Sequence, residues 1–352
     1  MKKIPTIDDL AGRLGIAKST VSKALSGKGT ISAGTRDRVR HAARELGYEP
    51  NPVAQRLAKG GRNPQVYLFS GTLDLGLATQ KIRLVQQALN EHGLEVPIYN
   101  APETVRAGGL TQAEQIRQIC RQRPRAILCA AQSVDPEVYR ELEAYRHEGG
   151  IVVSYDTPIP LPCDQVIFDR EGNGYRTARH LLEHGHRKIG VGMTAISARL
   201  ANAENIPQAQ RLRGFRRALD EAGVPFREEW LFANQSYEAG GEQMARRFLE
   251  MPERPTGLCI VNDIVAFTFM VDVMRAGVRV PGDVSIVSHD NQPITARCPV
   301  PMTSATQPAE EIARAAAGML LERIDGYAGP PRVVTVRGEL VERDSVAAPP
   351  AS

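Results

Sequence analysis

Four polar side chains share one face of a short helix that is expected near the start of the chain. Within residues 17–25, Lys18, Ser19, Ser22 and Lys23 lie opposite the apolar positions at helical spacing, with no acidic residue among them. Ammonium and hydroxyl groups suit hydrogen bonding to phosphates and to the edges of bases. This face therefore predicts contact with a nucleic acid.

A second set of polar side chains follows strand-like segments later in the chain. Asn262 and Asp263 come directly after one predicted strand, Asp290 comes after the next, and Arg211 offers a planar guanidinium with five donors. Carboxylates, an amide and a planar guanidinium suit the hydroxyls of a small molecule, and ligands of such folds bind beyond the carboxyl ends of the strands. The alternative is that Asp263 and Asp290 only cap the helices that follow them.

Three short helices are expected to position the basic face. Thr6 begins the first helix and Gly15 ends it, the helix at 18–25 follows after a brief turn, and the third runs from Ser32 to Gly47. Two short helices joined by a tight turn and braced by a third form a helix-turn-helix, whose second helix enters the major groove of DNA. A helical bundle without a partner is the alternative interpretation.

The charge of the chain is divided unevenly. The total is 352 residues with a formal net charge of +4, yet residues 1–62 carry 13 Lys and Arg against five Asp and Glu, which is +8. The rest of the chain therefore carries −4. A basic head on a mildly acidic body indicates a nucleic-acid partner for the head, although a merely solvated basic surface would have the same charge.

From residue 65 onward, short apolar segments alternate with amphipathic helices in two successive series. This order predicts parallel, doubly wound sheets covered by helices on both faces, and two series predict two lobes. The predicted fold class is α/β, with a small all-α helix-turn-helix head and a two-lobed doubly wound core.

Several motifs together resemble one family. Those in the head are Thr6-Ile7-Asp8-Asp9-Leu10-Ala11, Ser19-Thr20-Val21-Ser22, Leu46-Gly47-Tyr48 and Pro50-Asn51-Pro52-Val53-Ala54. Those in the body include His184-Gly185-His186-Arg187-Lys188-Ile189, Val280-Pro281-Gly282-Asp283-Val284-Ser285-Ile286 and His289-Asp290-Asn291. The chain resembles the lactose-repressor/galactose-repressor (LacI/GalR) family of bacterial transcription regulators. The weak stretch is 70–79, where the usual family pattern is replaced.

The resemblance implies a role for residues in the head and the linker. Residues matching base-reading positions are Lys18, Ser19 and Lys23, and those matching backbone contacts are Thr20, Ser22, Ser32, Thr35 and Asn51. Thr6 and Ala54 belong to the matching motifs and are also expected at the DNA. The segment 51–59 resembles a hinge helix that folds in the minor groove, with Leu57 as a wedge between base pairs.

For the core, the resemblance implies two lobes like those of periplasmic sugar-binding proteins. The positions matching Arg211, Asn262 and Asp290 touch the effector in that family, and Phe168 and Asp169 lie where the chain first crosses between the lobes. Asp263 is added as a candidate. We expect a transcription regulator, and specifically a repressor, that binds a near-palindromic operator on double-stranded DNA as a homodimer. A small effector, a sugar or sugar derivative, is expected to control its binding to DNA.

The predicted organisation follows from these assignments. The head spans 1–50, the hinge helix and linker 51–62, one lobe 63–168 with 308–336, the other lobe 169–307 with 337–346, and a flexible tail 347–352.

The composition argues against a membrane protein, a secreted protein and a protein held by disulfides or zinc. No apolar run is long enough for a membrane span and the first residues lack the apolar region of a signal peptide, so we expect a cytoplasmic protein with no membrane partner. Five cysteines without a C-x-x-C pair indicate neither a disulfide framework nor a zinc cluster. We expect no metal and no cofactor.

An α/β nucleotide-binding enzyme is the alternative from another class. Gly190 and Gly192 fit a dinucleotide fingerprint, but the acidic residue that should follow about 20 positions later is missing. His180, His184 and His186 could suggest a metal, yet no carboxylate or cysteine completes the set, so a solvated surface is expected.

Overall fold

A computed structural model of the chain describes residues 5–26, 31–48, 63–71, 76–100, 109–130, 133, 135–194, 206–234 and 239–351. The chain divides into two compact units, Met1–Pro64 and Gln65–Ser352, each with its own hydrophobic core. Within the described ranges no helix is both long and apolar enough to cross a membrane.

The first unit consists of helices α1 (Ile7–Leu14), α2 (Lys18–Ser26) and α3 (Ala33–Leu46). Thr6 and Asp9 form a capping box at the start of α1, and Gly15 and Gly47 end α1 and α3 in the left-handed conformation, with φ of 64° and 65°. The three helices meet over a small apolar core that includes Leu10, Val21 and Val39, all fully buried. The predicted helix-turn-helix is confirmed.

The second unit contains two six-stranded sheets. The first has the order β11-β5-β4-β3-β1-β2, and β1 with β2, β3 with β4, β4 with β5 and β5 with β11 pair in parallel. Its strands are β1 (Asn63–Ser70), β2 (Ile98–Asn100), β3 (Pro124–Ala130), β4 (Ile151–Asp156), β5 (Asp164–Phe168) and β11 (Val333–Val336).

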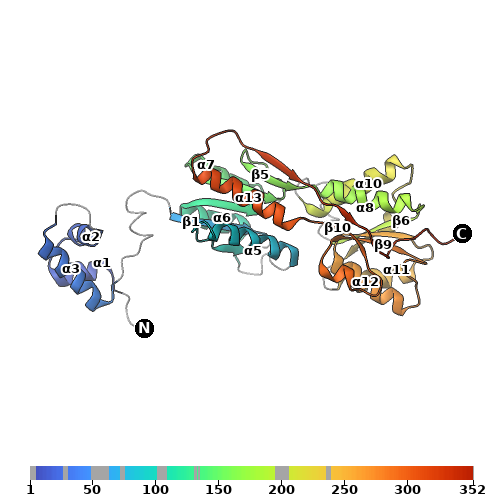
Figure 1. The fold of residues 1–352 in the computed structure, drawn as a ribbon, viewed down its shortest axis with the longest axis horizontal. Helices are drawn as coiled ribbons and strands as arrows, with labels where there is room; N and C mark the ends of the chain where they lie inside the picture. The colour runs from blue at the N-terminus through green and yellow to red at the C-terminus, as the bar shows by residue number, and fades with distance from the viewer. Residues whose placement is uncertain are drawn as a thin grey trace. The chain divides into compact units, whose positions relative to one another are not determined.

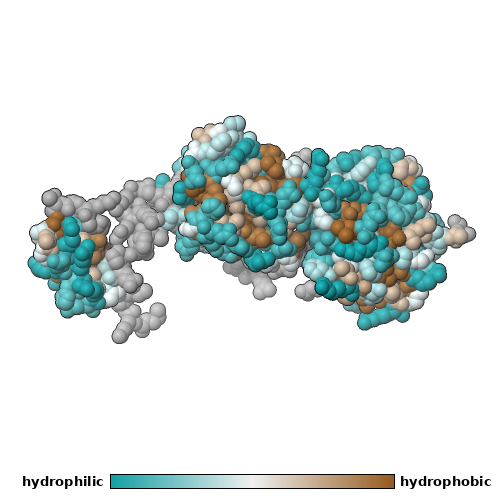
Figure 2. Space-filling view, in the orientation of Figure 1, coloured by the Kyte–Doolittle hydropathy of each residue, from teal (hydrophilic) through white to brown (hydrophobic). Residues whose placement is uncertain are grey.

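Helices cover both faces of this first sheet. Alternate residues of β1 point to opposite sides, so that Val66 and Leu68 pack with one pair of helices and Tyr67 and Phe69 with another. The first pair is α5 (Gly76–Asn90) and α13 (Ala309–Ile324); the second is α6 (Gln112–Arg121) and α7 (Pro136–His147). On the face drawn in Figure 2, the apolar side chains of this unit lie in separate patches among hydrophilic ones, as expected for helices that bury their apolar sides.

The second sheet repeats this plan with the order β12-β10-β9-β8-β6-β7. Its strands are parallel except for β12, which runs antiparallel to β10. They are β6 (Ile189–Thr194), β7 (Leu231–Asn234), β8 (Gly257–Ile260), β9 (Ser285–Asp290), β10 (Thr303–Thr306) and β12 (Leu340–Val341). One face is covered by α8 (Arg170–Glu183) and α10 (Pro207–Glu221), and the other by α11 (Gly240–Glu250) and α12 (Asp263–Arg275). Two short 3₁₀ turns, η1 (Glu228–Trp230) and η2 (Pro293–Ala296), lie between elements of this part of the chain.

The chain passes between the two sheets after β5, after β10 and after β11 (Figure 1). Because it leaves at the carboxyl ends of parallel strands, those ends of both sheets adjoin the crossing segments. Two of these segments touch: a Cβ added at Gly338 would lie 2.1 Å from the carbonyl oxygen of Thr306. The predicted two-lobed doubly wound core is confirmed, and its carboxyl-end edges are the place to look for a site.

The residue at which a tail is predicted to begin is tied to the second sheet. The Ala347 N–H donates to Ser285 Oγ at 3.1 Å, and its carbonyl lies 2.9 Å from His186 Nε2. Ser345 is fully buried just before it.

Helices α8 and α10 approach so closely that only glycine fits at two points of their contact. A Cβ at Gly174 would lie 2.1 Å from the Arg211 carbonyl oxygen, and one at Gly214 would lie 1.9 Å from the Glu171 carbonyl oxygen. Since the obstacles are backbone atoms, they cannot rotate away. This contact fixes the helix that carries Arg211 against the helix that begins at the first crossing.

Gly214→Ala should therefore destabilise the second unit by about 1–3 kcal/mol, because the added methyl group must push two helices apart. Trp230 is the one tryptophan of the chain and is buried in this unit, so its fluorescence during urea unfolding reports the effect. The control is Gly318→Ala in α13, where a Cβ meets no atom within 4 Å and should stabilise by up to about 1 kcal/mol. Equal unfolding midpoints for Gly214→Ala and the parent would contradict the close contact.

Candidate functional site

The exposed face of α2 carries the side chains that the sequence places at DNA. Lys18, Ser19, Ser22 and Lys23 are exposed and Thr20 is half-buried, while the opposite face of the helix lies in the core of the first unit. The helix is therefore held by its apolar side and presents two ammonium groups and two hydroxyls outward.

Lys18 forms an ion pair with Asp8 of α1. The side chains are 61% and 57% exposed, so solvent screens the pair and it contributes little to stability. A phosphate or a base edge can replace Asp8 as the partner of this ammonium group at small cost.

Two of the hydroxyls predicted to contact DNA cap helices in the free protein, and a third contacts one of them. Thr6 Oγ1 accepts a hydrogen bond from the Asp9 N–H at 3.3 Å. Ser32 Oγ accepts one from the Thr35 N–H at 3.2 Å and lies 2.8 Å from Thr35 Oγ1. These contacts place all three at the first turns of α1 and α3. The other predicted DNA contacts lie outside the described residues: Asn51, Ala54 and Leu57.

In the second unit, two carboxylates end equivalent strands of the two sheets. Asp156 is the last residue of β4 and Asp290 the last of β9, and each strand is third from the same edge of its sheet. Both residues have positive φ, 72° and 100°, which costs a residue with a Cβ about 1–3 kcal/mol. Strain of this kind is tolerated where surrounding contacts hold the residue in place, and both carboxylates have such contacts.

Asp290 gathers donors from three other segments. Its Oδ1 accepts from Gln307 Nε2 at 2.6 Å and from Arg211 Nη2 at 3.3 Å, and its Oδ2 accepts from Asn262 Nδ2 at 3.3 Å. Arg211 and Asn262 are each only 5% exposed. Asn262 also caps α12 by accepting from the Ile264 N–H at 2.8 Å. The structure thus brings together three of the residues predicted to bind an effector.

Asp156 is held by two cations. Lys81 Nζ lies 2.5 Å from Oδ1 and Arg170 Nη2 lies 2.7 Å from Oδ2, and all three side chains are at least nine-tenths buried. Burial alone would raise the pKa of the Asp156 carboxyl, but the charges of Arg170 and Lys81 outweigh it and hold that pKa well below its usual range. Burial lowers the pKa of Lys81, against the opposing pull of Asp156.

A single side chain joins these two clusters. Gln307, directly after β10, donates to Asp290 and accepts from Lys81 Nζ at 3.1 Å. The result is a continuous series of hydrogen bonds and ion pairs, here named the polar chain, from the second sheet through a crossing segment to the first sheet. Its members are Arg211, Asn262, Asp290, Gln307, Lys81, Asp156 and Arg170.

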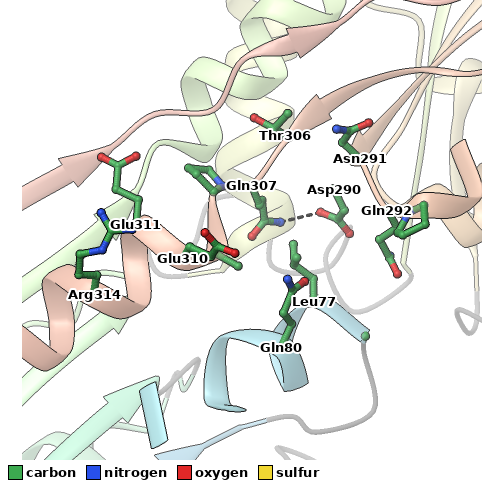
Figure 3. A pocket seen from close by; sticks show the side chains of 14 residues that line it. Leu77, Gln80, Asp290, Asn291, Gln292, Thr306, Gln307, Glu310, Glu311 and Arg314 are labelled. Carbon is green, nitrogen blue, oxygen red and sulfur yellow. Dashed lines mark hydrogen bonds between the residues drawn. The ribbon is translucent and has the colours of Figure 1, made fainter. Parts of the chain in front are cut away.

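A cavity of about 850 Å³ opens beside the polar chain. Figure 3 shows Asp290 and Gln307 pointing toward each other at its centre, with Leu77 and Gln80 of α5 facing them. Its mouth is lined by the exposed start of α13, where Glu310 carries a carboxylate. The volume lies within the range of small-molecule sites.

Two predicted effector residues at the first crossing have other contacts. Phe168 is 1% exposed and belongs to the core of the first sheet. Asp169 caps α8, since its carboxylate accepts from the Gly172 N–H at 2.8 Å. Phe168 and Asp169 thus pack and cap at the point where the chain first crosses between the sheets. Their contact with an effector stays a prediction.

Asp263 is not among the residues that line the cavity, and it is fully buried. Its Oδ1 accepts from Ser288 Oγ at 2.5 Å and Ser304 Oγ at 2.8 Å, and its Oδ2 accepts from the Gln292 N–H at 2.6 Å. Burial and the nearby charge of Asp290 raise the pKa of its carboxyl to about 7. These contacts tie the segment after β9 to the sheet, and it is Asn262, not Asp263, that caps α12.

Sequence reasoning misses four members of the polar chain: Lys81, Asp156, Arg170 and Gln307. One signal was present for Lys81, because it lies four residues after Leu77 and four before Val85, on the buried side of a helix. Asp156 ends β4 as Asp290 ends β9. A charged residue on an apolar stripe, or at a strand end, is the pattern that would have found both.

The expectation of a solvated histidine surface is wrong for two of the three histidines. His180 is 6% exposed and His186 is fully buried, the latter 2.9 Å from Thr256 Oγ1 and from the Ala347 carbonyl. The ring of His186 lies against the C-terminal segment, a contact that the sequence pattern did not predict. Among the described residues no group of His, Cys, Asp and Glu is arranged to hold a metal ion.

The glycines that suggested a nucleotide fingerprint lie inside a strand. Gly190 and Gly192 are both within β6, and a Cβ would lie 2.8 Å from the Trp230 carbonyl oxygen at the first and 2.8 Å from Met244 Sδ at the second. They are required by packing between neighbouring elements, which removes the basis for the nucleotide-binding alternative.

Comparison with known families matches both units. Residues 6–51 match the family described as bacterial regulatory proteins, lacI family, and residues 178–346 match the periplasmic binding protein-like domain. The first unit thus contains a LacI-family DNA-binding domain, and the second unit contains a periplasmic binding protein-like domain. With these two domains the protein is a DNA-binding transcription regulator with a ligand-binding unit, and not an enzyme.

Relatives match this chain along nearly its whole length. The HTH-type transcriptional repressor PurR of Aliivibrio salmonicida (strain LFI1238) is 28% identical over 352 residues, covering 97% of this chain and 98% of the relative. The repressor of the same name from Yersinia pestis bv. Antiqua (strain Antiqua) is 28% identical over 342 residues, covering 97% of each.

Solved structures share the fold. The lac repressor dimer bound to operator and the anti-inducer ONPF has a TM-score of 0.73 at 22% identity, covering 98% of this chain and all of that one. A complex of the transcriptional regulator CelR with cellobiose has a TM-score of 0.68 at 23% identity, covering 97% and 100%. A LacI-family regulator from Silicibacter pomeroyi has a TM-score of 0.74 at 23% identity, covering 97% and 99%.

Asp263→Asn should flatten the pH dependence of stability. Because the folded-state pKa of about 7 lies above the ordinary 3.8, the fold favours the protonated carboxyl, and the free energy of unfolding falls as pH rises through this window by at most about 1.4 kcal/mol per pH unit. The asparagine variant lacks this titration, so its stability relative to the parent should increase from about pH 5 to pH 7.5. Urea unfolding followed by Trp230 measures it, with Asp220→Asn on the exposed face of α10 as the control. A parallel pH profile for parent and variant would contradict the raised pKa.

Proposed function

We propose that this protein is a repressor that binds a near-palindromic operator as a homodimer and whose DNA affinity is set by a small effector bound at the polar chain. The arrangement of Asp290, Arg211, Asn262 and Gln307 beside a cavity is the observation that carries the effector half of this proposal. The exposed face of α2 carries the DNA half.

The DNA half rests on charge and geometry. The first 62 residues carry +8, and α2 presents Lys18 and Lys23 on the face opposite its buried side. In a helix-turn-helix dimer the two second helices enter successive major grooves, about one turn of duplex apart. The name of the curated relatives, transcriptional repressor, supports repression rather than activation.

The effector half rests on hydrogen-bonding capacity at the lobe junction. We assign 63–168 with 308–336 to one lobe and 169–307 with 337–346 to the other, so that the polar chain joins them. Carboxylates, amides and a guanidinium are the groups that bind hydroxyls, which favours a sugar or sugar derivative. The structure of a fold neighbour with cellobiose supports the same class.

A purine-related effector is the second candidate, because the name PurR of the relatives suggests one. The same carboxylates and amides can pair with ring nitrogens and exocyclic groups. A titration of operator complexes with sugars and with purine bases separates the two candidates.

The direct test is a gel shift with DNA from upstream of the protein's own gene, at about 50 and 200 mM salt. Specific binding that weakens with salt and responds to an added small molecule supports the proposal. Equal affinity for this DNA and for random DNA at both salt concentrations, with no response to any small molecule, would refute it.

Lys23→Ala should weaken binding to the operator by about 1–3 kcal/mol and reduce binding to random DNA much less, because its ammonium group is proposed to contact base edges. The control is Arg40→Ala, which removes one exposed charge from α3 instead of α2. Fluorescence anisotropy with both DNAs gives the ratio of the two affinities. An equal loss on both DNAs would show that Lys23 contacts only phosphates.

Asp290→Ala should abolish the effector response while leaving operator binding by the effector-free protein intact. The substitution removes the acceptor on which Arg211, Asn262 and Gln307 converge. Operator binding as a function of effector concentration measures the response, with Asp220→Ala on the exposed face of α10 as the control. A dose response equal to that of the parent would remove Asp290 from the site.

A further inference from the structure

The polar chain holds more positive than negative charge at one end. Lys81 and Arg170 both pair with Asp156, at 2.5 and 2.7 Å, and the exposed fractions of Lys81, Arg170 and Asp156 are only 3%, 3% and 5%. Two cations thus share one carboxylate in a place that water hardly reaches.

The neighbouring carboxylates are matched by cations of their own. Asp290 pairs with Arg211 at 3.3 Å, and Asp169 pairs with Arg176 at 4.0 Å. Asp263 is bound by two serine hydroxyls and a backbone N–H. The charge of Asp290 also acts on Lys81, but the ion pair of Asp290 is with Arg211, so the surplus positive charge lies on the side of Asp156.

A buried charge without a full counter-charge is unfavourable, and an opposite charge brought to it is correspondingly favoured. The pKa values of two nearby basic groups reflect this excess of positive charge. Burial lowers the pKa of Lys81 and the charge of Arg170 lowers it further. Burial also lowers the pKa of His289, and the charges of Arg211 and Arg176 add to that effect, so this histidine is neutral.

The excess positive charge lies next to the cavity. Lys81 Nζ donates to Gln307, whose side chain lines the cavity, and Lys81 lies one helical turn from Leu77 and next to Gln80, which both line it. Figure 3 shows the Gln307 side chain directed toward Asp290 among the lining residues. A rotation of this one amide away from Asp290 would open the way to the ammonium group. Arg170 Nε, buried and without a hydrogen-bond partner, leaves a further donor unused.

We propose that the ligand of this site carries an anionic group, a carboxylate or a phosphate, which is bound by Lys81 and Arg170, while its uncharged hydrogen-bonding groups meet Asp290, Asn262 and Gln307. This inference rests on the proposed function and specifies the ligand of the same site. Glu310 and Glu311 are exposed and line the cavity together with the exposed Arg314, so this part of the lining carries one more negative than positive charge. The buried cations are therefore the more favourable place for the charged end of the ligand.

The test uses the purified full-length protein and pairs of probes that differ in one ionised group. The pairs are glucose with glucuronate, galactose with galacturonate, glucose with glucose 6-phosphate, and adenosine with adenosine monophosphate. Binding is measured by calorimetry and by thermal shift at equal ionic strength, with sodium chloride and inorganic phosphate as controls for unspecific anion binding. The carboxylate and phosphate pairs separate the two sources of negative charge.

Lys81→Met removes the ammonium group and keeps the length of the side chain. It should weaken binding of the preferred anion about tenfold to a hundredfold, since a hydrogen bond to a charged group is lost. Lys81→Arg keeps the charge and should retain the preference, which guards against a variant that merely folds poorly. Lys188→Met, at an exposed ion pair with Glu253, is the matched control and should bind like the parent.

The expected result is that at least one anion binds more tightly than its neutral counterpart and loses this advantage in Lys81→Met but not in Lys81→Arg or Lys188→Met. Tighter binding of a neutral probe, an advantage that survives in Lys81→Met, or the absence of any preference for an anion would each overturn the inference. None of these outcomes touches the proposed function, which stands or falls with operator binding and its response to any small molecule.

Discussion

The burial of two carboxylates where two sheets meet is the constraint on which the second unit depends. A buried carboxylate is tolerated only while donors surround it, and the donors of Asp290 and Asp156 come from helices and strand ends far apart in the sequence. Both residues also have a strained backbone. Any movement of one sheet against the other must therefore change hydrogen bonds at these two residues.

This constraint gives a ligand a means to act on the fold. Gln307 lies between the last residue of β10 and the start of α13, on a segment that crosses between the sheets, and it touches both clusters. A ligand that replaces Gln307 as the partner of Asp290 or Lys81 changes the contacts of a crossing segment directly. Coupling between sites needs such an element with two arrangements, each favoured by a different occupant.

Sequence patterns predicted most of the fold and three of the seven members of the polar chain, for physical reasons that differ between residues. Helix caps such as Thr6 and Gly15 are local, and strand–helix alternation is visible in one dimension. Arg211, Asn262 and Asp290 were found because they belong to family motifs or follow strands. Lys81 and Gln307 become neighbours only when α5 and a crossing segment 226 residues later pack together. The burial of His186 likewise depends on the C-terminal segment, which no local pattern reveals.

The chain meets negative charge in two different ways. On α2 the ammonium groups are exposed, so their attraction to phosphates is long-ranged, screened by salt and shared among many sites. At the polar chain the cations are buried and their positions are fixed by Asp156, so an anion gains from a low local dielectric and from geometry, and salt affects it little. The first arrangement suits a DNA site that the protein must find by searching along a duplex. The second suits a small molecule that must be distinguished from others of similar size.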